Sequence, residues 1–174
     1  QNKRREIKIQ KNTNNLAPIQ IIPKKKPLML GYEGKTSTIL KDKDFNLAKK
    51  SFSYIKRRSW KSAISTANKS SDKLLPKIVT WMFLKQENNS ATFQDYKKFI
   101  DKNKNWPRIS RLRYLAEHKI NYKNLSALNV IDFFKEEVPT SGYGFIRLGE
   151  AYVIRGNTTA GIPLIKKGFK TAKL

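Results

Sequence analysis

The stretch Thr92-Phe93-Gln94-Asp95-Tyr96-Lys97-Lys98-Phe99-Ile100 indicates the fold class. Thr92 and Asp95 match a capping box, in which each of the two side chains binds a backbone amide at the start of a helix. Apolar residues then recur three or four positions apart, which is the spacing of one helix face. The stretch therefore predicts a helix whose inward-facing residues are Phe93, Tyr96, Phe99 and Ile100.

The same spacing continues on both sides of this stretch. Toward the N terminus it predicts three helices, which begin near Asp44, Trp60 and Pro76. The third has candidate caps at Ser70, Ser71 and Asp72. Toward the C terminus it predicts a helix with Pro107 at its first position, one near 125–137, one after Ser141-Gly142, and one with Pro163 in its first turn or at its start.

These last helices have defined inward positions. The predicted set is Leu125, Leu128, Ile131 and Phe134, then Phe145, Leu148, Ala151 and Tyr152, and finally Ile165, Gly168, Phe169 and Ala172. No segment shows the period-two alternation of a strand. The chain is therefore predicted to be all-α, with about eight antiparallel helices.

Small residues recur near aromatic ones, as with Ala63 and Ala67 after Trp60 and Ala116 after Trp106. Alternating small and large inward residues are typical of the closely packed hairpins of tetratricopeptide-like repeats. We expect a superhelical array, that is, an α-solenoid, and a closed bundle remains the alternative. The helical domain should span residues 44–174.

Residues 1–43 contain Lys, Asn and Pro with little periodicity, and we expect them to form an extended, mostly disordered arm. Lys24, Lys25 and Lys26 lie between Pro23 and Pro27. The chain starts at Gln1 rather than Met, so we expect a processed form or an excised fragment. No signal peptide is visible in it, and this says nothing about location.

The composition excludes several classes of function. The chain has no cysteine and a single histidine among its 174 residues, which excludes disulfide scaffolds, thiolate metal sites and His-rich metal centres. No apolar run is long enough for a membrane span. We therefore expect no cofactor and no metal.

The net charge of +24 first suggests a nucleic-acid partner. Its distribution weakens that interpretation. Residues 1–43 carry eleven Lys and Arg against three Asp and Glu, and residues 44–174 carry 26 against 10. An excess spread along the whole chain is typical of a solvated helical surface, and nucleic-acid binding is expected to be non-specific at most.

No residue pattern predicts an active site. His118 has no partner base nearby, and the adjacent Glu136 and Glu137 lie at a predicted helix end. Gly142-Tyr143-Gly144 lacks the preceding strand and the third glycine of a dinucleotide-binding fingerprint. The segment from Phe52 to Trp60 mixes aromatic and basic residues, but its spacing favours core residues beside a charged turn. We assign no catalytic, cofactor-binding or metal-binding residue.

Several segments together resemble a known family. They are Leu74-Leu75-Pro76-Lys77-Ile78-Val79-Thr80-Trp81, Ser90-Ala91-Thr92-Phe93, Phe99-Ile100-Asp101-Lys102-Asn103, Asn105-Trp106-Pro107, Leu112-Arg113-Tyr114-Leu115-Ala116-Glu117, Pro139-Thr140-Ser141-Gly142-Tyr143-Gly144 and Arg147-Leu148-Gly149-Glu150-Ala151. This combination is similar to the N-terminal superhelical (U-type) domain of soluble lytic murein transglycosylases of Gram-negative bacteria, over residues 45–174. Lys104 stands where the family usually has proline. The motif positions, expected to be structural, are Trp81, Phe93, Trp106, Pro107, Leu112, Arg113, Glu117, Gly142 and Gly144.

The resemblance implies a periplasmic cell-wall lyase that cleaves the MurNAc–GlcNAc bond of peptidoglycan to a 1,6-anhydro product. Its catalytic glutamate belongs to a C-terminal lysozyme-like domain that has no counterpart in these 174 residues. The chain is thus expected to be a non-catalytic scaffold whose partner is the glycan strand, with its positive charge attracting peptidoglycan carboxylates. The alternatives are a helical-repeat adaptor that binds a protein in its groove and, third, a basic nucleic-acid-binding module.

Overall fold

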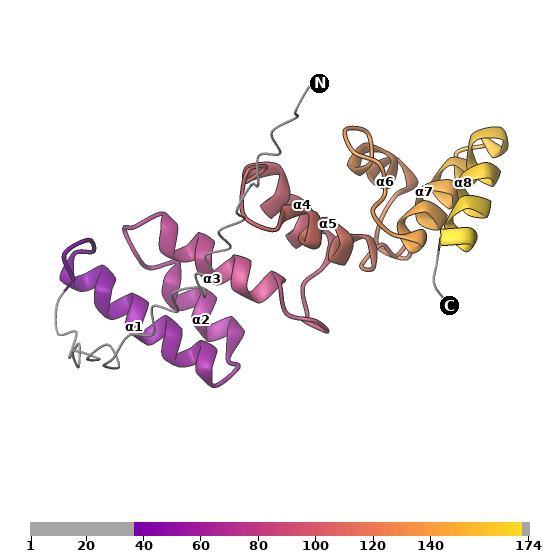
Figure 1. Cartoon of the computed structure of the whole chain (residues 1–174). Coiled ribbons are helices and arrows are strands. Elements are labelled where there is room, and N and C mark those ends of the chain that lie inside the picture. Colours follow the sequence, from indigo (N-terminus) through magenta and orange to yellow (C-terminus); the bar gives the residue numbers. More distant parts are fainter. Residues whose placement is uncertain (1–36, 172–174) are drawn as a thin grey trace, which may run out of the picture. The chain divides into compact units, whose positions relative to one another are not determined.

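The structure is a computed structural model, and it describes residues 37–171. This part of the chain contains eight α-helices and no β-strand, as the apolar spacing predicts (Figure 1). The helices are α1 (Asp42–Lys56), α2 (Trp60–Ala67), α3 (Leu74–Leu84), α4 (Phe93–Lys102), α5 (Ile109–Glu117), α6 (Ala127–Phe133), α7 (Gly142–Ile154) and α8 (Thr158–Thr171). Most of the expected arm, and the inward position expected at Ala172, lie outside the described residues.

Most helices that follow one another in the sequence also pack against one another (Figure 1). Contacts join α1 to α2, α2 to α3, α4 to α5, α6 to α7 and α7 to α8. A further contact joins α5 to α7, so the fourth and fifth helices are held to the C-terminal ones. The described helices belong to one compact unit.

The helices enclose two hydrophobic clusters, and α3 belongs to both. Leu75 and Val79, near the start of α3, pack with the small residues Ala48, Ala63 and Ala67 of α1 and α2. The end of α3 joins the second cluster, whose buried members are Leu84, Ala91, Phe93, Tyr96, Phe99, Ile100, Leu112, Ala116, Ile120, Leu125, Ala127, Val130, Phe133, Phe134, Leu148 and Ala151. A single apolar helix therefore connects the two packing centres.

The capping box predicted at the start of α4 is confirmed. The Thr92 amide donates to the Asp95 carboxylate at 2.8 Å, and the Asp95 amide donates to Thr92 Oγ1 at 3.3 Å. The predicted inward residues of this helix are all buried. Asp72 similarly accepts the amides of Leu74 and Leu75 at the start of α3.

The prediction that Pro107 occupies the first position of a helix is wrong, because α5 begins two residues later, at Ile109. Arg108 between them has a φ of 60°, in the left-handed region, so the helix cannot extend back through it. The carbonyl of Pro107 instead accepts the indole N–H of Trp81 at 3.0 Å.

Helix α6 is shorter than the predicted 125–137. Of the four predicted inward residues, Leu125 and Phe134 are buried, Ile131 is partly buried and Leu128 is exposed. The Ser126 hydroxyl accepts the Asn129 amide at 3.3 Å, so the helix begins at Ala127. This phase buries Val130 and Phe133 and leaves Leu128 60% exposed, so the inward prediction for Leu128 is wrong.

The last helix also departs from the sequence prediction, because Pro163 lies inside α8 rather than in its first turn. The helix begins five residues earlier, at Thr158, and the Asn157 side chain accepts the Ala160 amide at 3.0 Å. Phe169 is 63% exposed, contrary to prediction, because Gly161 and Gly168 form the face of α8 that contacts α7.

Glycines allow α7 and α8 to approach backbone to backbone. A Cβ atom added at Gly161 would lie 2.6 Å from the carbonyl oxygen of Gly149, and one at Gly168 would lie 2.5 Å from that of Gly142. Both distances are well below van der Waals contact. The two glycine pairs therefore fix how closely this antiparallel hairpin packs.

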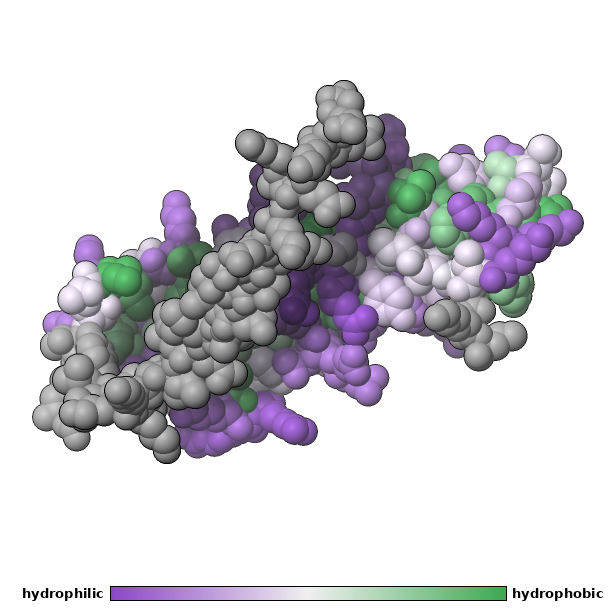
Figure 2. Space-filling view, in the orientation of Figure 1, coloured by the Kyte–Doolittle hydropathy of each residue, from purple (hydrophilic) through white to green (hydrophobic). Residues whose placement is uncertain are grey.

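The charged residues are distributed along the surface. Hydrophilic residues cover much of the face seen in Figure 2, and hydrophobic residues lie between them in separate patches. No helix among residues 37–171 combines the length and the apolar character that crossing a bilayer requires.

Candidate functional site

Glu117, at the end of α5, is a fully buried carboxylate, with 0% of its surface exposed. Its Oε1 accepts the backbone amide and the hydroxyl of Thr140 at 2.7 and 2.8 Å. Its Oε2 accepts the backbone amide of Ser141 at 2.8 Å and also the Ser141 hydroxyl. The carboxylate thus satisfies four donors just before α7, where the helix dipole also favours negative charge.

Gly144 is the third residue of α7 and lies directly against this carboxylate. A Cβ atom at Gly144 would be 2.6 Å from Cδ of Glu117. The Gly144 amide donates to the Ser141 hydroxyl at 2.9 Å, which caps the helix. Glycine is therefore required here by the space that the carboxylate occupies.

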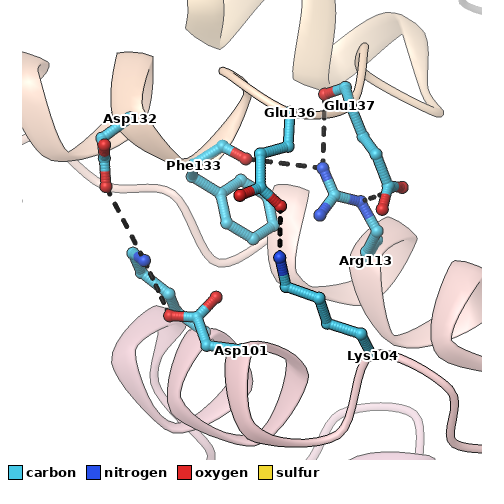
Figure 3. Close-up of polar contacts among 8 residues, drawn as sticks. Asp101, Lys104, Arg113, Asp132, Phe133, Glu136 and Glu137 are labelled. Carbon is cyan, nitrogen blue, oxygen red and sulfur yellow. Dashed lines mark hydrogen bonds and ion pairs between the residues drawn. The ribbon is translucent and has the colours of Figure 1, made fainter.

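Arg113 lies one helical turn before Glu117 on α5 and is also buried. Its guanidinium donates to the carbonyl oxygens of Phe133 and Glu137, at 3.4 and 3.3 Å, and forms an ion pair with the Glu137 carboxylate at 2.9 Å (Figure 3). A helix that continued past Phe133 would need that carbonyl for its own ladder. Arg113 therefore fixes the end of α6 while Glu117 fixes the start of α7.

Further ion pairs connect α4 to α6, and the segment after α4 to the segment after α6 (Figure 3). Lys97 lies 2.8 Å from the Asp101 carboxylate and 3.8 Å from that of Asp132. Lys104 bonds Glu136 at 2.6 Å, and this contact lowers the pKa of the Glu136 carboxyl. Together with Arg113 these residues line a hollow of about 510 Å³. Apart from Lys135, the charged side chains that line it are paired with one another or with Glu137, as expected for a structural network.

The aromatic motif residues also serve packing. The indole of Trp106 meets the Phe99 ring edge-on, with centroids 6.3 Å apart, and Lys77 Nζ lies 5.0 Å from the Trp106 centroid. Phe93 meets Phe133 edge-on at 4.9 Å. Leu112 is fully buried in the second hydrophobic cluster.

The structure therefore brings six of the nine motif residues into three groups of contacts. They are the Trp81–Pro107 hydrogen bond, the Phe93–Phe133–Arg113 cluster and the Glu117–Gly144 contact. Gly142 is separate from these, since it faces Gly168 of α8. The contacts hold helices together, and none of them leaves a carboxylate open to a substrate.

His118 is part of an aromatic stack that the sequence pattern did not predict. Its exposed ring lies between Tyr114, at 4.5 Å, and Tyr143, at 5.2 Å and nearly parallel. Arg147 lies 4.6 Å from the Tyr143 ring on α7. The spacing of four residues between Tyr114 and His118 is a weak signal, but nothing in the sequence pairs either of them with Tyr143.

Two further hollows flank the loop between α3 and α4. The first, of about 960 Å³, contains Trp60 and Phe83 with basic and amide side chains. The second, of about 590 Å³, contains Tyr96, Tyr114 and His118. Both include Gln86, Glu87 and Asn88, so they are neighbours.

The described residues contain no group of three or more His, Cys, Asp or Glu side chains arranged to hold a metal ion. Comparisons with known proteins gave no match to a family model, a curated protein or a solved structure. A functional assignment therefore depends on the residues and their geometry.

Proposed function

We propose that this chain is the non-catalytic helical region of a lytic murein transglycosylase, and that it acts in the periplasm as a scaffold for the peptidoglycan glycan strand. One observation carries the proposal. Two of the runs that together carry the resemblance, Leu112–Glu117 and Pro139–Gly144, are separated in sequence but meet through Glu117, Thr140, Ser141 and Gly144. Motif residues that contact one another support the resemblance more strongly than matches at isolated positions.

The role of Glu117 supports a scaffold rather than a catalyst. A general acid for glycosidic bond cleavage must reach the leaving oxygen. Glu117 is enclosed, and both of its oxygens are taken by Thr140 and Ser141. Glu136 and Glu137 are held in ion pairs with Lys104 and Arg113. Each of these carboxylates has a structural partner that accounts for it.

A superhelical arrangement is part of the proposal. In such arrays each helical hairpin contacts mainly its neighbours in sequence. The contacts among α1, α2 and α3 and among α6, α7 and α8 follow this rule. Small buried residues at close contacts, such as Ala63, Ala67 and Gly149, are also what tetratricopeptide-like hairpins use.

The test is sedimentation of the purified chain with murein sacculi, together with chromatography of the released products. We expect the chain to be retained on sacculi at physiological ionic strength. Retention there is informative because attraction between charges alone weakens as salt screens it. We expect no release of 1,6-anhydro products. A folded chain that stays in solution at physiological salt contradicts the scaffold role, and release of anhydro products contradicts the non-catalytic assignment.

A further inference from the structure

The two hollows lie next to each other at the loop between α3 and α4, and three residues of this loop line both of them. Arg58, Trp60 and Lys61, around the start of α2, line the first hollow from one side. Tyr114 and His118, on α5 and just after it, line the second from the other. Because Gln86, Glu87 and Asn88 line both, this loop lies between the two hollows and sets the distance from one to the other.

The first hollow combines an aromatic wall with cations. The rings of Trp60 and Phe83 are 5.8 Å apart and tilted by 44°, and both are half-buried. Arg58 and Lys61 are exposed beside them, and within residues 37–171 neither forms an ion pair. Aromatic faces bury the hydrocarbon side of a ring-shaped ligand, while cations bind its acidic substituents.

The second hollow repeats this combination. The Arg111 guanidinium lies 5.0 Å from the Tyr114 ring centroid and pairs with Glu87 at 2.8 Å. Lys119 donates to the Asn89 carbonyl at 2.7 Å, and the edge of the His118 ring is exposed next to Tyr114. Each hollow therefore offers aromatic surface and positive charge, at a spacing set by the shared loop.

Arg58 occupies a position where arginine is unfavourable. It follows the end of α1 with a φ of 58°, and its amide donates to the Ile55 carbonyl at 2.8 Å. A left-handed residue at this point is usually glycine or asparagine, because a longer side chain costs about 1 kcal/mol there.

We propose that the two hollows are adjacent subsites for an acidic glycan strand, each accommodating a sugar that carries a carboxylate. This inference rests on the proposed function and specifies where the strand is held. Five cationic residues line the hollows, namely Arg58, Lys61, Lys85, Arg111 and Lys119, against the single carboxylate of Glu87.

Glu87 and its neighbours favour a glycan over a nucleic acid. A polynucleotide carries a phosphate on every unit, and the carboxylate of Glu87 lies at the point shared by both hollows. The side chains of Gln86 and Asn88 beside it supply hydrogen-bond donors and acceptors, which suit sugar hydroxyl and acetamido groups. This mixture fits a ligand with sparse negative charge and many neutral polar groups.

The experiment measures the affinity of the full chain, at physiological ionic strength, for peptide-free murein glycan strands that retain the lactyl carboxylate. The first variant is Arg58→Asn with Lys61→Gln, in which asparagine suits the left-handed backbone and keeps the fold intact. The second is His118→Gln with Lys119→Gln in the other hollow. The matched control, Lys166→Gln with Lys170→Gln on α8, removes two equally exposed charges elsewhere. Circular dichroism verifies that each variant is folded.

We expect the Arg58 and Lys61 variant to lose affinity for the strands about tenfold, since two exposed charge contacts are removed. The His118 and Lys119 variant should also weaken binding, while the control changes it less than about twofold. Chitin oligosaccharides, which lack the carboxylate, should bind more weakly than murein strands. Oligo(dT) should not bind more tightly than murein strands.

Two outcomes overturn the subsites without affecting the scaffold role. One is unchanged strand binding in either hollow variant. The other is an equal loss of binding in the control, which would show that the effect does not depend on where the removed charges lie. Tighter binding of oligo(dT) overturns the choice of ligand. If the wild-type chain binds neither sacculi nor strands, the proposed function itself fails.

Discussion

The carboxylate of Glu117 on α5 occupies the space that a side chain at Gly144 on α7 would need. Its Cδ atom is 2.6 Å from the position of a Cβ at residue 144. The Thr140 and Ser141 donors hold the carboxylate in place, so it cannot move aside without losing hydrogen bonds. This contact couples α5 to α7, although α6 lies between them in the sequence.

Replacement of Gly144 by alanine should destabilise the protein by about 1–3 kcal/mol, the usual cost of overpacking. The sign of this change in the free energy of unfolding is diagnostic, because a glycine-to-alanine change within a helix ordinarily stabilises a protein by about 0.5–1 kcal/mol. Denaturant unfolding followed by circular dichroism measures the difference. A more stable Gly144→Ala variant would show that the carboxylate is not confined as described.

Glu117→Gln should cost about 2–3 kcal/mol in the free energy of unfolding. The glutamine amide group would place N–H donors opposite the amide and hydroxyl donors of either Thr140 or Ser141. Glu150→Gln serves as a control, because Glu150 is partly exposed and pairs with Arg147 on its own helix. That change should cost less than about 1 kcal/mol. Similar losses in both variants would argue against a special role for the buried carboxylate.

Gly161→Ala should separate α7 from α8 and destabilise the protein by about 3 kcal/mol. The obstacle is the backbone carbonyl of Gly149, which cannot rotate away as a side chain would. Gly156→Ala is the comparison. Nothing lies within 4 Å of a Cβ there, and its φ of 83° alone should cost about 1 kcal/mol. Thermal unfolding of both variants ranks the two effects, and an equal loss would contradict the close approach of the helices.

The stability of the protein should depend on the protonation of Asp44. Its carboxylate accepts the Ser70 hydroxyl and the Ser71 amide, both at 2.8 Å, and these bonds lower its pKa from the ordinary 3.8. The deprotonated form therefore stabilises the folded state. That contribution is complete above pH 3.8 and is lost as the pH falls through the lower folded-state pKa.

Unfolding experiments on both sides of pH 3.8 should show a smaller acid-induced loss of stability in Asp44→Asn than in the wild type. Asp42→Asn removes an exposed aspartate from the same first turn of α1 and is the matched control. It should retain the wild-type acid profile. Identical profiles of stability against pH for all three proteins would show that the hydrogen bonds of Asp44 do not contribute to acid sensitivity.

The Lys104–Glu136 contact should be measurable as a pKa change rather than as stability. The ammonium group of Lys104 lowers the pKa of the Glu136 carboxyl through a hydrogen bond and through its charge. In Lys104→Ala that pKa should rise toward the ordinary value, as followed by NMR titration of the side chain. Added salt should raise it in the wild type as well, because the pair is exposed and screened. If neither Lys104→Ala nor added salt changed the pKa of Glu136, the pair would not form in solution.

Local patterns predicted much of the fold and little of the candidate site. The capping box at Thr92 and the cap at Ser141 involve residues three apart, so each is visible in a short stretch of sequence. Arg108 shows the opposite case. It adopts a left-handed conformation beside a proline, which no preference of arginine indicates. The stack of His118 on Tyr143 joins two helices and leaves no periodic signal.

The sequence alone determined that the part of the chain after the predicted arm is helical and where most of its helices begin. It also determined that the positive charge is spread along the whole chain. These features depend on neighbours within a turn or two, and such contacts follow from helix geometry. Only the tertiary structure decided that Arg113 and Glu117 turn inward to hold the ends of two other helices, and that the loop at Glu87 separates two hollows. Such contacts join residues that are distant in sequence. They form only when the helices pack, because packing leaves one arrangement that satisfies a buried charge or accommodates a close approach at a glycine.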